Sequence, residues 1–324
     1  MAAERRPAAA AGWLIVAPLL AVATARVVAW DSRSILVALN ALTPLLYLPT
    51  WPVAVAAGLG RRWALCATAA TVVIAHVAFM TPELAARTPT PATVAGSRAI
   101  RLFSANVYAG NTRAAGIARE IRDAAPDLVF LQEATPAIVD AIDATGALDE
   151  LPHRVAVRRT DPFGALLASR WPLADQDVVE LERRPIAVRA TIDTGDGPIR
   201  LYAVHVIAPF GGGREAWRRE LGHVAGAVGA ETGPVIVAGD FNATWGHRAF
   251  RRLLDAGLTD AAAARGRPFQ MTWDRSRRFV GPLARIDHVL TTPALTVTAI
   301  RTGEGLGSDH RPLIADVTRV HRAS

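Results

Sequence analysis

The stretch PVIVAGDFN, residues 234–242, is the most informative segment for how the larger part of this chain folds. Its apolar run from Val235 to Ala238 is short and rich in β-branched side chains, which predicts a buried strand. Asp240 and Asn242 follow where that strand ends. Because a sheet is rigid and its strand ends open into loops, polar residues at this position are well placed to carry chemistry.

The same pattern recurs along residues 99–324. Further polar residues lie at or just beyond apolar, strand-like runs: Asn106, Glu133, His205, Asp287, Asp309 and His310. Helical patterns at residues 112–124 and around Trp217 separate these runs, and IAVRATID and IRLYAVHV predict a hairpin across residues 194–198. This succession predicts an α/β fold, with sheets covered by helices in one domain.

The residue types at these strand ends indicate a kind of chemistry. They are carboxylates, carboxamides and imidazoles, with no positioned serine or cysteine nucleophile. Hard oxygen ligands favour Mg²⁺ or Mn²⁺ over zinc. Such an ion, with histidine and asparagine donors beside it, suits the stabilisation of charge on phosphoryl oxygens. The single cysteine, Cys66, excludes a disulfide framework and a cysteine-rich zinc site.

The motifs SANV, LQE, GDFN, IDHV and SDHRP occur in this order within residues 101–314. Together they resemble the endonuclease/exonuclease/phosphatase superfamily over essentially the whole predicted domain. The resemblance implies a four-layer α/β sandwich, in which two mixed β-sheets are flanked by helices and the site lies at one sheet edge. It also implies a metal-dependent hydrolase of phosphoester or pyrophosphate bonds.

The resemblance assigns the metal to one group of residues. Glu133 resembles the principal metal-binding glutamate, and Asn106 and Asp309 are expected beside the ion. Asn106 also has a structural interpretation as a turn cap, a role for which Asn111 is a rival.

The resemblance assigns catalysis to a second group. Asp240 matches the aspartate that orients or deprotonates the attacking water, and Asn242 matches the asparagine that holds a phosphate oxygen. His310 is expected to contact the scissile phosphate, and Asp287 to orient that histidine.

His205 occupies a position where phosphatase and sphingomyelinase-like members carry a histidine. Abasic-site nucleases have a tyrosine nearby, so this residue argues against a repair nuclease. Two structural interpretations stay open: His205 as a histidine satisfied within its strand, and Asp287 as a turn cap.

The N-terminal third is apolar. Residues 12–30, 35–58 and 63–80 form three long apolar stretches, and about twenty such residues match the ~30 Å hydrocarbon core of a bilayer. We expect residues 1–80 to be a membrane anchor of three transmembrane helices and residues 81–98 a linker. Pro44, Pro49 and Pro52 weaken the second stretch as a regular helix. A signal peptide and a buried soluble bundle are the alternatives.

The charge distribution separates the two parts. Residues 1–98 hold eight arginines against three acidic residues, and residues 99–324 hold 28 against 26. Most of the +7 net charge therefore lies in the apolar part, which is not the footprint of a nucleic-acid binder. Arginines at positions 5, 6, 61 and 62 predict cytoplasmic ends. Three spans then place the catalytic domain outside the cytoplasm in a multi-pass membrane protein.

These features favour a lipid-linked phosphate or pyrophosphate as substrate. The layout is similar to actinobacterial membrane proteins linked to teicoplanin-type resistance, which implies a phospholipid or polyprenyl phosphate. In the loop APFGGGREAW, Phe210 and Trp217 are candidates for contact with an acyl or prenyl chain, although a flexible surface loop is equally consistent. No obligate protein partner is inferred.

Two rival functions remain. A membrane-tethered extracellular nuclease would use the basic cluster Arg275, Arg277 and Arg278 near Trp273, which could equally hold anionic headgroups. A non-catalytic membrane sensor would predict a broken catalytic set, whereas the set here is complete.

Overall fold

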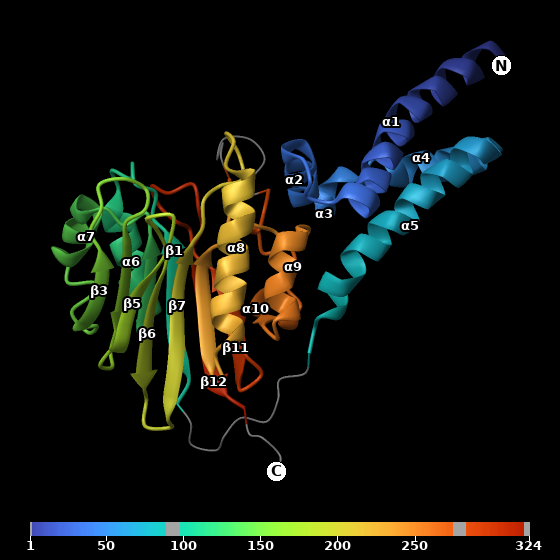
Figure 1. Cartoon of the computed structure of the whole chain (residues 1–324). Helices are drawn as coiled ribbons and strands as arrows, with labels where there is room; N and C mark the ends of the chain where they lie inside the picture. The colour runs from blue at the N-terminus through green and yellow to red at the C-terminus, as the bar shows by residue number, and fades with distance from the viewer. Residues whose placement is uncertain (1, 89–97, 275–282, 321–324) are drawn as a thin grey trace. The chain divides into compact units, whose positions relative to one another are not determined.

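The computed structural model describes residues 2–88, 98–274 and 283–320, with side chains from residue 9 onward. Arg275, Arg277 and Arg278 lie outside these residues. The chain forms two compact units (Figure 1). The first comprises Met1–Ala85 with Trp245–Arg248, and the second comprises Ala86–Thr244 with Ala249–Ser324.

Two helices of the first unit are long and apolar enough to cross a membrane: residues 9–29 within α1 (Ala2–Ala29), and α5 (Trp63–Ala85). The apolar stretch between them is broken into α2 (Ser34–Ala41), α3 (Thr43–Leu46) and α4 (Thr50–Leu59). The segments Ser34–Ala41 and Thr43–Leu59 meet at an angle of 74°. The unit therefore has two candidate spans, or three if the bent pair crosses as one. The prolines explain the break, because each removes a helical N–H donor.

Three charged residues of the first unit are buried, namely Arg26, Asp31 and Glu83. Arg26 is only 2% exposed although it belongs to an apolar helix. Its guanidinium lies over the Phe79 ring, 4.3 Å from the centroid, and donates to the Thr43 hydroxyl. A buried guanidinium needs such partners, since an unpaired buried charge is strongly unfavourable.

The second unit contains two six-stranded sheets. The first sheet has the order β11-β12-β1-β2-β4-β3 and is built from β1 (Ile100–Asn106), β2 (Leu128–Gln132), β3 (His153–Val157), β4 (Ala165–Ser169), β11 (Leu295–Thr302) and β12 (Leu313–Arg319). The second has the order β5-β6-β7-β8-β10-β9 and is built from β5 (Ala174–Leu181), β6 (Arg184–Asp193), β7 (Pro198–His205), β8 (Val235–Asp240), β9 (Thr259–Asp260) and β10 (Asp287–Thr291). Both are mixed, because β1 runs parallel to β2 and β7 parallel to β8.

Helices flank the two sheets, as the sequence predicts. The helices are α6 (Ala114–Ala124), α7 (Pro136–Asp143), α8 (Arg214–Gly229), α9 (Arg248–Asp255) and α10 (Ala261–Ala264). Leu102 and Phe130 of the first sheet share one buried core with Leu201 and Ile236 of the second, which places this core between the sheets. On its other face the first sheet packs against α6 and α7 in a separate core. The result is an α/β sandwich (Figure 1).

This architecture brings strand ends together. The parallel pair β1 and β2 ends at Asn106 and Gln132, and the parallel pair β7 and β8 ends at His205 and Asp240. The Asn106 side chain donates to Asp240 across 3.0 Å, so the two ends meet although they belong to different sheets.

Candidate active site

Asp240 lies at the centre of the candidate site. It ends β8, where its register partners are His205 on β7 and Asp287 on β10. Three chemically active side chains therefore come from adjacent strands. Asp240 is only 1% exposed, and burial, which disfavours the charged form, raises the pKa of its carboxyl to about 7. This carboxyl can thus exchange a proton near neutral pH.

His310 and Asp287 form a buried pair beside Asp240. The His310 Nδ1 donates to an Asp287 oxygen at 2.9 Å, and its Nε2 lies 3.8 Å from an Asp240 oxygen. Burial alone would lower the pKa of His310, but the Asp287 and Asp240 carboxylates outweigh it and raise the pKa to about 10. The imidazolium form therefore prevails at neutral pH, and its Nε2–H can donate to an anionic oxygen.

The loop that carries His310 is tied to the first sheet. The Ser308 hydroxyl donates to the backbone carbonyl of Asn106 at 2.7 Å and accepts from the His310 N–H at 3.0 Å. The SDHRP motif is therefore held where β1 ends, although it follows β11 in the chain.

Glu133 joins the cluster through Asn106. The Asn106 amide group donates to Glu133 and to Asp240, each at 3.0 Å, and its oxygen accepts from the Tyr108 N–H at 3.0 Å. The second Glu133 oxygen accepts from the Ala109 N–H at 2.9 Å. Glu133 has a φ of 54°, a left-handed conformation that non-glycine residues rarely adopt and that often marks a functional site.

The GDFN turn is constrained on both sides of Asp240. Gly239 has a φ of 142°, and a Cβ there would lie 1.9 Å from the Val204 carbonyl oxygen, so only glycine fits. Asn242 has a φ of 46°. Its N–H donates to Asp240 at 2.8 Å and its amide to the Val206 carbonyl at 2.9 Å. The bonds from the Asn242 N–H and from the Asn106 amide fix the direction of the Asp240 carboxylate.

His205 is buried against the Phe163 ring, with centroids 6.1 Å apart. Burial lowers the pKa of its imidazole, so the neutral form prevails. Its Nε2 lies 3.9 Å from Asp240, and its Nδ1 has no hydrogen-bond partner among the described residues. A buried ring nitrogen without a partner is unusual and leaves one polar atom for a water or a substrate oxygen.

The site fits a hard divalent cation by its donor set. Glu133 is half-buried, and each of its oxygens accepts one hydrogen bond, which leaves a lone pair for an ion. Ligand atoms of Asp240, Asp287 and His310 lie within 4.8 Å of one another. His310 is the least suitable of these, because an imidazolium has no lone pair to offer. The carboxylates are therefore the candidate ligands.

The hydrogen bonds of Asp309 go to residues outside this carboxylate cluster. One of its oxygens accepts from the Trp273 indole N–H at 3.2 Å. Its backbone carbonyl accepts from the Asp274 N–H at 3.0 Å. These bonds connect Asp309 to the segment before β10, and its role in holding a metal stays a prediction.

Phe210 and Trp217, the candidates for acyl contact, occupy different environments. Phe210 is 53% exposed, whereas Trp217 is fully buried and donates its indole N–H to the Phe241 carbonyl at 3.3 Å. Trp217 thus supports the loop that follows β8, and the structure does not bring it to the surface.

A buried network behind the site was not predicted from the sequence. His288, on β10 next to Asp287, lies 2.6 Å from Asp260 through Nδ1 and 2.9 Å from the Ala243 carbonyl through Nε2. Arg285 donates to both Asp260 oxygens at 2.7 Å. The pKa of Asp260 stays well below its usual range: burial alone would raise it, but Arg285 and His288 outweigh that effect. Only the adjacency of His288 to Asp287 was a signal in the sequence.

The catalytic unit matches a known protein family and resembles solved structures. Residues 103–310 match the model of the Endonuclease/Exonuclease/phosphatase family. A search of curated proteins gives no significant match.

Similar solved structures include an endonuclease/exonuclease/phosphatase from Beutenbergia cavernae, with 19% identity, 69% of this chain and 72% of that chain covered, and a TM-score of 0.52. TDP2 from D. rerio complexed with single-strand DNA product has 18% identity, 68% and 99% coverage and a TM-score of 0.58. The 3' phosphatase NExo from Neisseria bound to product DNA hairpin has 20% identity, 67% and 98% coverage and a TM-score of 0.54. At these identities the likeness supports the fold alone.

Proposed function

The chain belongs to the endonuclease/exonuclease/phosphatase family of metal-dependent phosphoesterases, and from that premise we propose that it hydrolyses a lipid-linked phosphate or pyrophosphate. The observation that carries the hydrolytic part is the hydrogen-bonded bridge from Glu133 through Asn106 to Asp240. It places a candidate metal ligand beside a carboxyl whose pKa is about 7. The lipid part rests on the apolar helices of residues 1–85.

The metal in this proposal is Mg²⁺ or Mn²⁺, held by Glu133 with Asn106 beside it, and a contribution from Asp309 stays a prediction. When bound, it would neutralise charge that develops on phosphoryl oxygens. Oxygen donors of this kind bind either ion well, whereas metals that prefer thiolate ligands bind poorly to them.

The chain's own side chains supply the remaining steps. Asp240 accepts a proton from the attacking water, for which a pKa near 7 is well matched. His310 donates its Nε2–H to a phosphoryl oxygen, while Asp287 holds the opposite ring nitrogen. In this proposal Asn242 and His205 donate to the same phosphoryl group.

Three observations support a lipid rather than a nucleic acid as the carrier of the phosphate. Two apolar helices, or three spans if the bent pair crosses as one, would anchor the enzyme to a bilayer. In this proposal the bent pair crosses as the third span, and the arginine bias of the helix ends then predicts a catalytic unit outside the cytoplasm, where chromosomal DNA is absent. Residues 99–324 hold 28 arginines against 26 acidic residues, whereas DNA-backbone binding normally needs a basic surface. Exposed Phe210 is a candidate for contact with the lipid chain.

A membrane-tethered nuclease is the second candidate. Two of the similar structures, TDP2 from D. rerio and the 3' phosphatase NExo from Neisseria, are complexes with DNA products. The same catalytic residues serve both substrate classes, so the fold does not choose between them. The complete catalytic set argues against a non-catalytic sensor.

A substrate panel on the detergent-purified full chain tests the proposal. It contains undecaprenyl pyrophosphate, sphingomyelin, phosphatidylinositol phosphates and single- and double-stranded DNA, each with Mg²⁺, with Mn²⁺ and with EDTA. We expect metal-dependent turnover of a lipid phosphate and little turnover of DNA. DNA turnover far above that of every lipid would overturn the lipid assignment. A reporter fused to the C-terminus tests the orientation.

A further inference from the structure

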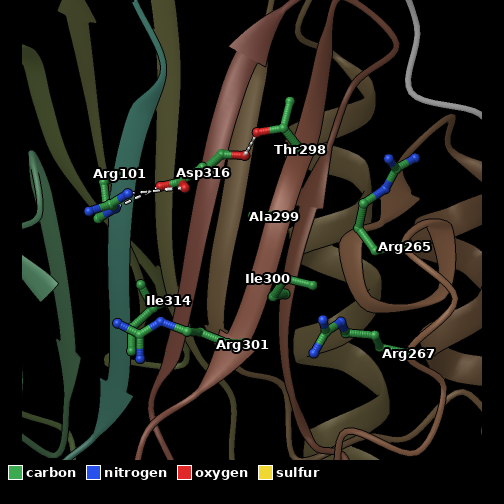
Figure 2. A pocket seen from close by; sticks show the side chains of 9 residues that line it. All are labelled: Arg101, Arg265, Arg267, Thr298, Ala299, Ile300, Arg301, Ile314 and Asp316. Atoms are coloured by element: carbon green, nitrogen blue, oxygen red, sulfur yellow. Dashed lines mark hydrogen bonds and ion pairs between the residues drawn. The ribbon is translucent and has the colours of Figure 1, made fainter.

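A basic pocket opens on the catalytic unit at the edge of its first sheet. Its volume is about 380 Å³, and its charged lining is Arg101, Arg265, Arg267, Arg301 and Asp316. β11 is the edge strand of this sheet. Figure 2 shows Arg265 and Arg267 on one side of β11, with Arg101 and Asp316 on the other. Four arginines face one aspartate, so the pocket is strongly positive.

Among the residues that the structure describes, two of these guanidiniums have no acidic partner. Arg101 is neutralised by Asp316 through bonds of 2.7 and 3.2 Å. Arg267 and Arg301 are exposed, and neither forms an ion pair with any residue in the described part of the chain. Since the unit as a whole is nearly balanced in charge, this pocket is a local concentration of positive charge. Guanidinium groups bind phosphate well, because their planar N–H donors match its oxygens.

The rim of the pocket is tied to the chain that leaves the last apolar helix. Arg265 donates to the Thr88 carbonyl at 2.7 Å, and the Thr88 N–H donates to Ala264 at 3.1 Å. The helix α5 ends at Ala85, and three residues of extended chain span at most roughly 10 Å. The three residues that connect the end of α5 to Thr88 at the pocket rim can therefore span no more than about 10 Å.

Neighbouring side chains extend this basic, membrane-compatible surface. The exposed Arg87 passes close to Gly266, with its Cδ 3.0 Å from where a glycine Cβ would lie. Phe269, two residues after Arg267, is 58% exposed. An exposed aromatic ring beside arginines is typical of segments that rest in the headgroup region of a bilayer.

We propose that this pocket binds the phosphate headgroup of an anionic phospholipid in the bilayer that anchors the chain. The inference rests on the membrane anchorage proposed above and does not depend on which substrate the active site hydrolyses. Basic residues close to a membrane surface gain about 1 kcal/mol each from anionic lipids. Arg267 and Arg301 together would therefore strengthen docking of the catalytic unit by about 30-fold.

The test uses the full chain in lipid nanodiscs. A Cys66→Ser background carries a fluorophore on Thr298→Cys, a pocket-lining and exposed position. Discs contain phosphatidylcholine alone or with 30% phosphatidylglycerol, each with the same trace of a headgroup spin-labelled lipid that quenches only at contact. We expect stronger quenching in the phosphatidylglycerol discs. Arg267→Ser/Arg301→Ser should lower the docking equilibrium constant by about 30-fold.

A matched control removes the same charge elsewhere. Arg158→Ser/Arg183→Ser changes two exposed arginines that form no ion pair with the described residues, and it should leave quenching unchanged. Turnover of a soluble phosphoester should be the same in both double variants, which separates this inference from the proposed hydrolytic function.

Several outcomes would overturn the inference. Equal quenching in the two kinds of disc would do so, as would an equal loss in both double variants. If inorganic phosphate changed the fluorescence in phosphatidylcholine discs and phosphatidylglycerol did not increase the quenching, the pocket would be a site for free phosphate. If a single-stranded oligonucleotide bound there more tightly than phosphatidylglycerol, the surface would belong to nucleic acid.

Discussion

Replacement of His288 by phenylalanine probes the network behind the catalytic strand. The change keeps an aromatic ring against Phe250, whose centroid is 4.1 Å away, and removes both ring nitrogens. His288 is only 1% exposed, and its nitrogens bridge Asp260 and the Ala243 carbonyl. Ala243 follows Asn242 directly, so the bridge holds the turn that carries the catalytic residues.

The magnitude follows from the two lost hydrogen bonds. A buried carbonyl left without its donor costs roughly 1–3 kcal/mol, and a charge-assisted bond contributes roughly 1.5–3 kcal/mol. Asp260 keeps Arg285 and the Ala263 N–H as partners, so its charge stays compensated. We expect a loss of about 4 kcal/mol in the free energy of unfolding, or roughly 10 °C in Tm for a unit of this size. A looser turn should also lower kcat by roughly 10²-fold, with KM nearly unchanged.

The assay is thermal unfolding of the full chain in detergent, followed by near-ultraviolet circular dichroism, together with kcat and KM far below the unfolding midpoint. His223→Phe is the matched control, because His223 is exposed on α8. A His288→Phe midpoint within about 2 °C of wild type would refute the stability estimate. An unchanged kcat would refute the claim that the network positions the catalytic turn.

Further predictions test other parts of the site. Gly239→Ala should destabilise the catalytic unit by roughly 3 kcal/mol or more, measured by urea unfolding, because its Cβ would lie 1.9 Å from the Val204 carbonyl oxygen. Gly233→Ala, with open space around it, should be tolerated, and equal stability of the two variants would contradict the reasoning. Asp287→Asn, studied in EDTA, should make the free energy of unfolding depend less on pH. In the folded wild type Asp287 helps to raise the pKa of His310 to about 10. The stabilisation from the protonated His310 is therefore complete below about pH 6.5 and is lost as the pH rises through 10. The variant's deficit in unfolding free energy should therefore shrink between pH 6.5 and 10, and a deficit that grew would reverse this sign. Trp217→Phe should lower the free energy of unfolding by about 1 kcal/mol and leave KM unchanged, and a large rise in KM would instead support Trp217 as a substrate contact.

Strands whose two faces are both buried could be predicted from their apolar sequences. Each residue of β2 and β8 is buried, and their apolar runs stand out in the sequence. β5, with the sequence ADQDVVEL, is largely exposed at the edge of its sheet, so it lacks an apolar signal. β11 alternates threonine with apolar residues and was not predicted either.

The candidate site was predictable where motifs placed polar residues at strand ends. Asn106, Glu133 and Asp240 converge because parallel strands end at one edge, which follows from the pattern. The bond between Asp260 and His288 joins residues 28 positions apart through the pairing of β9 with β10, and no local pattern encodes it. The direction of Trp217 was likewise unpredictable, since a helical period shows that a face is buried but not what it covers.

The most direct test of the central claim measures single-turnover hydrolysis by the wild type and by Asp240→Asn, each with Mg²⁺ and with EDTA. The preferred phosphoester of the substrate panel is used. We predict turnover that requires the metal and falls by at least roughly 10³-fold in Asp240→Asn. The variant should still fold and lose no more than roughly 3 kcal/mol of unfolding free energy, because asparagine is neutral and isosteric but leaves one buried donor, from Asn106 or Asn242, without its oxygen acceptor. Near-wild-type turnover in the folded variant, or full turnover in EDTA, would contradict the account.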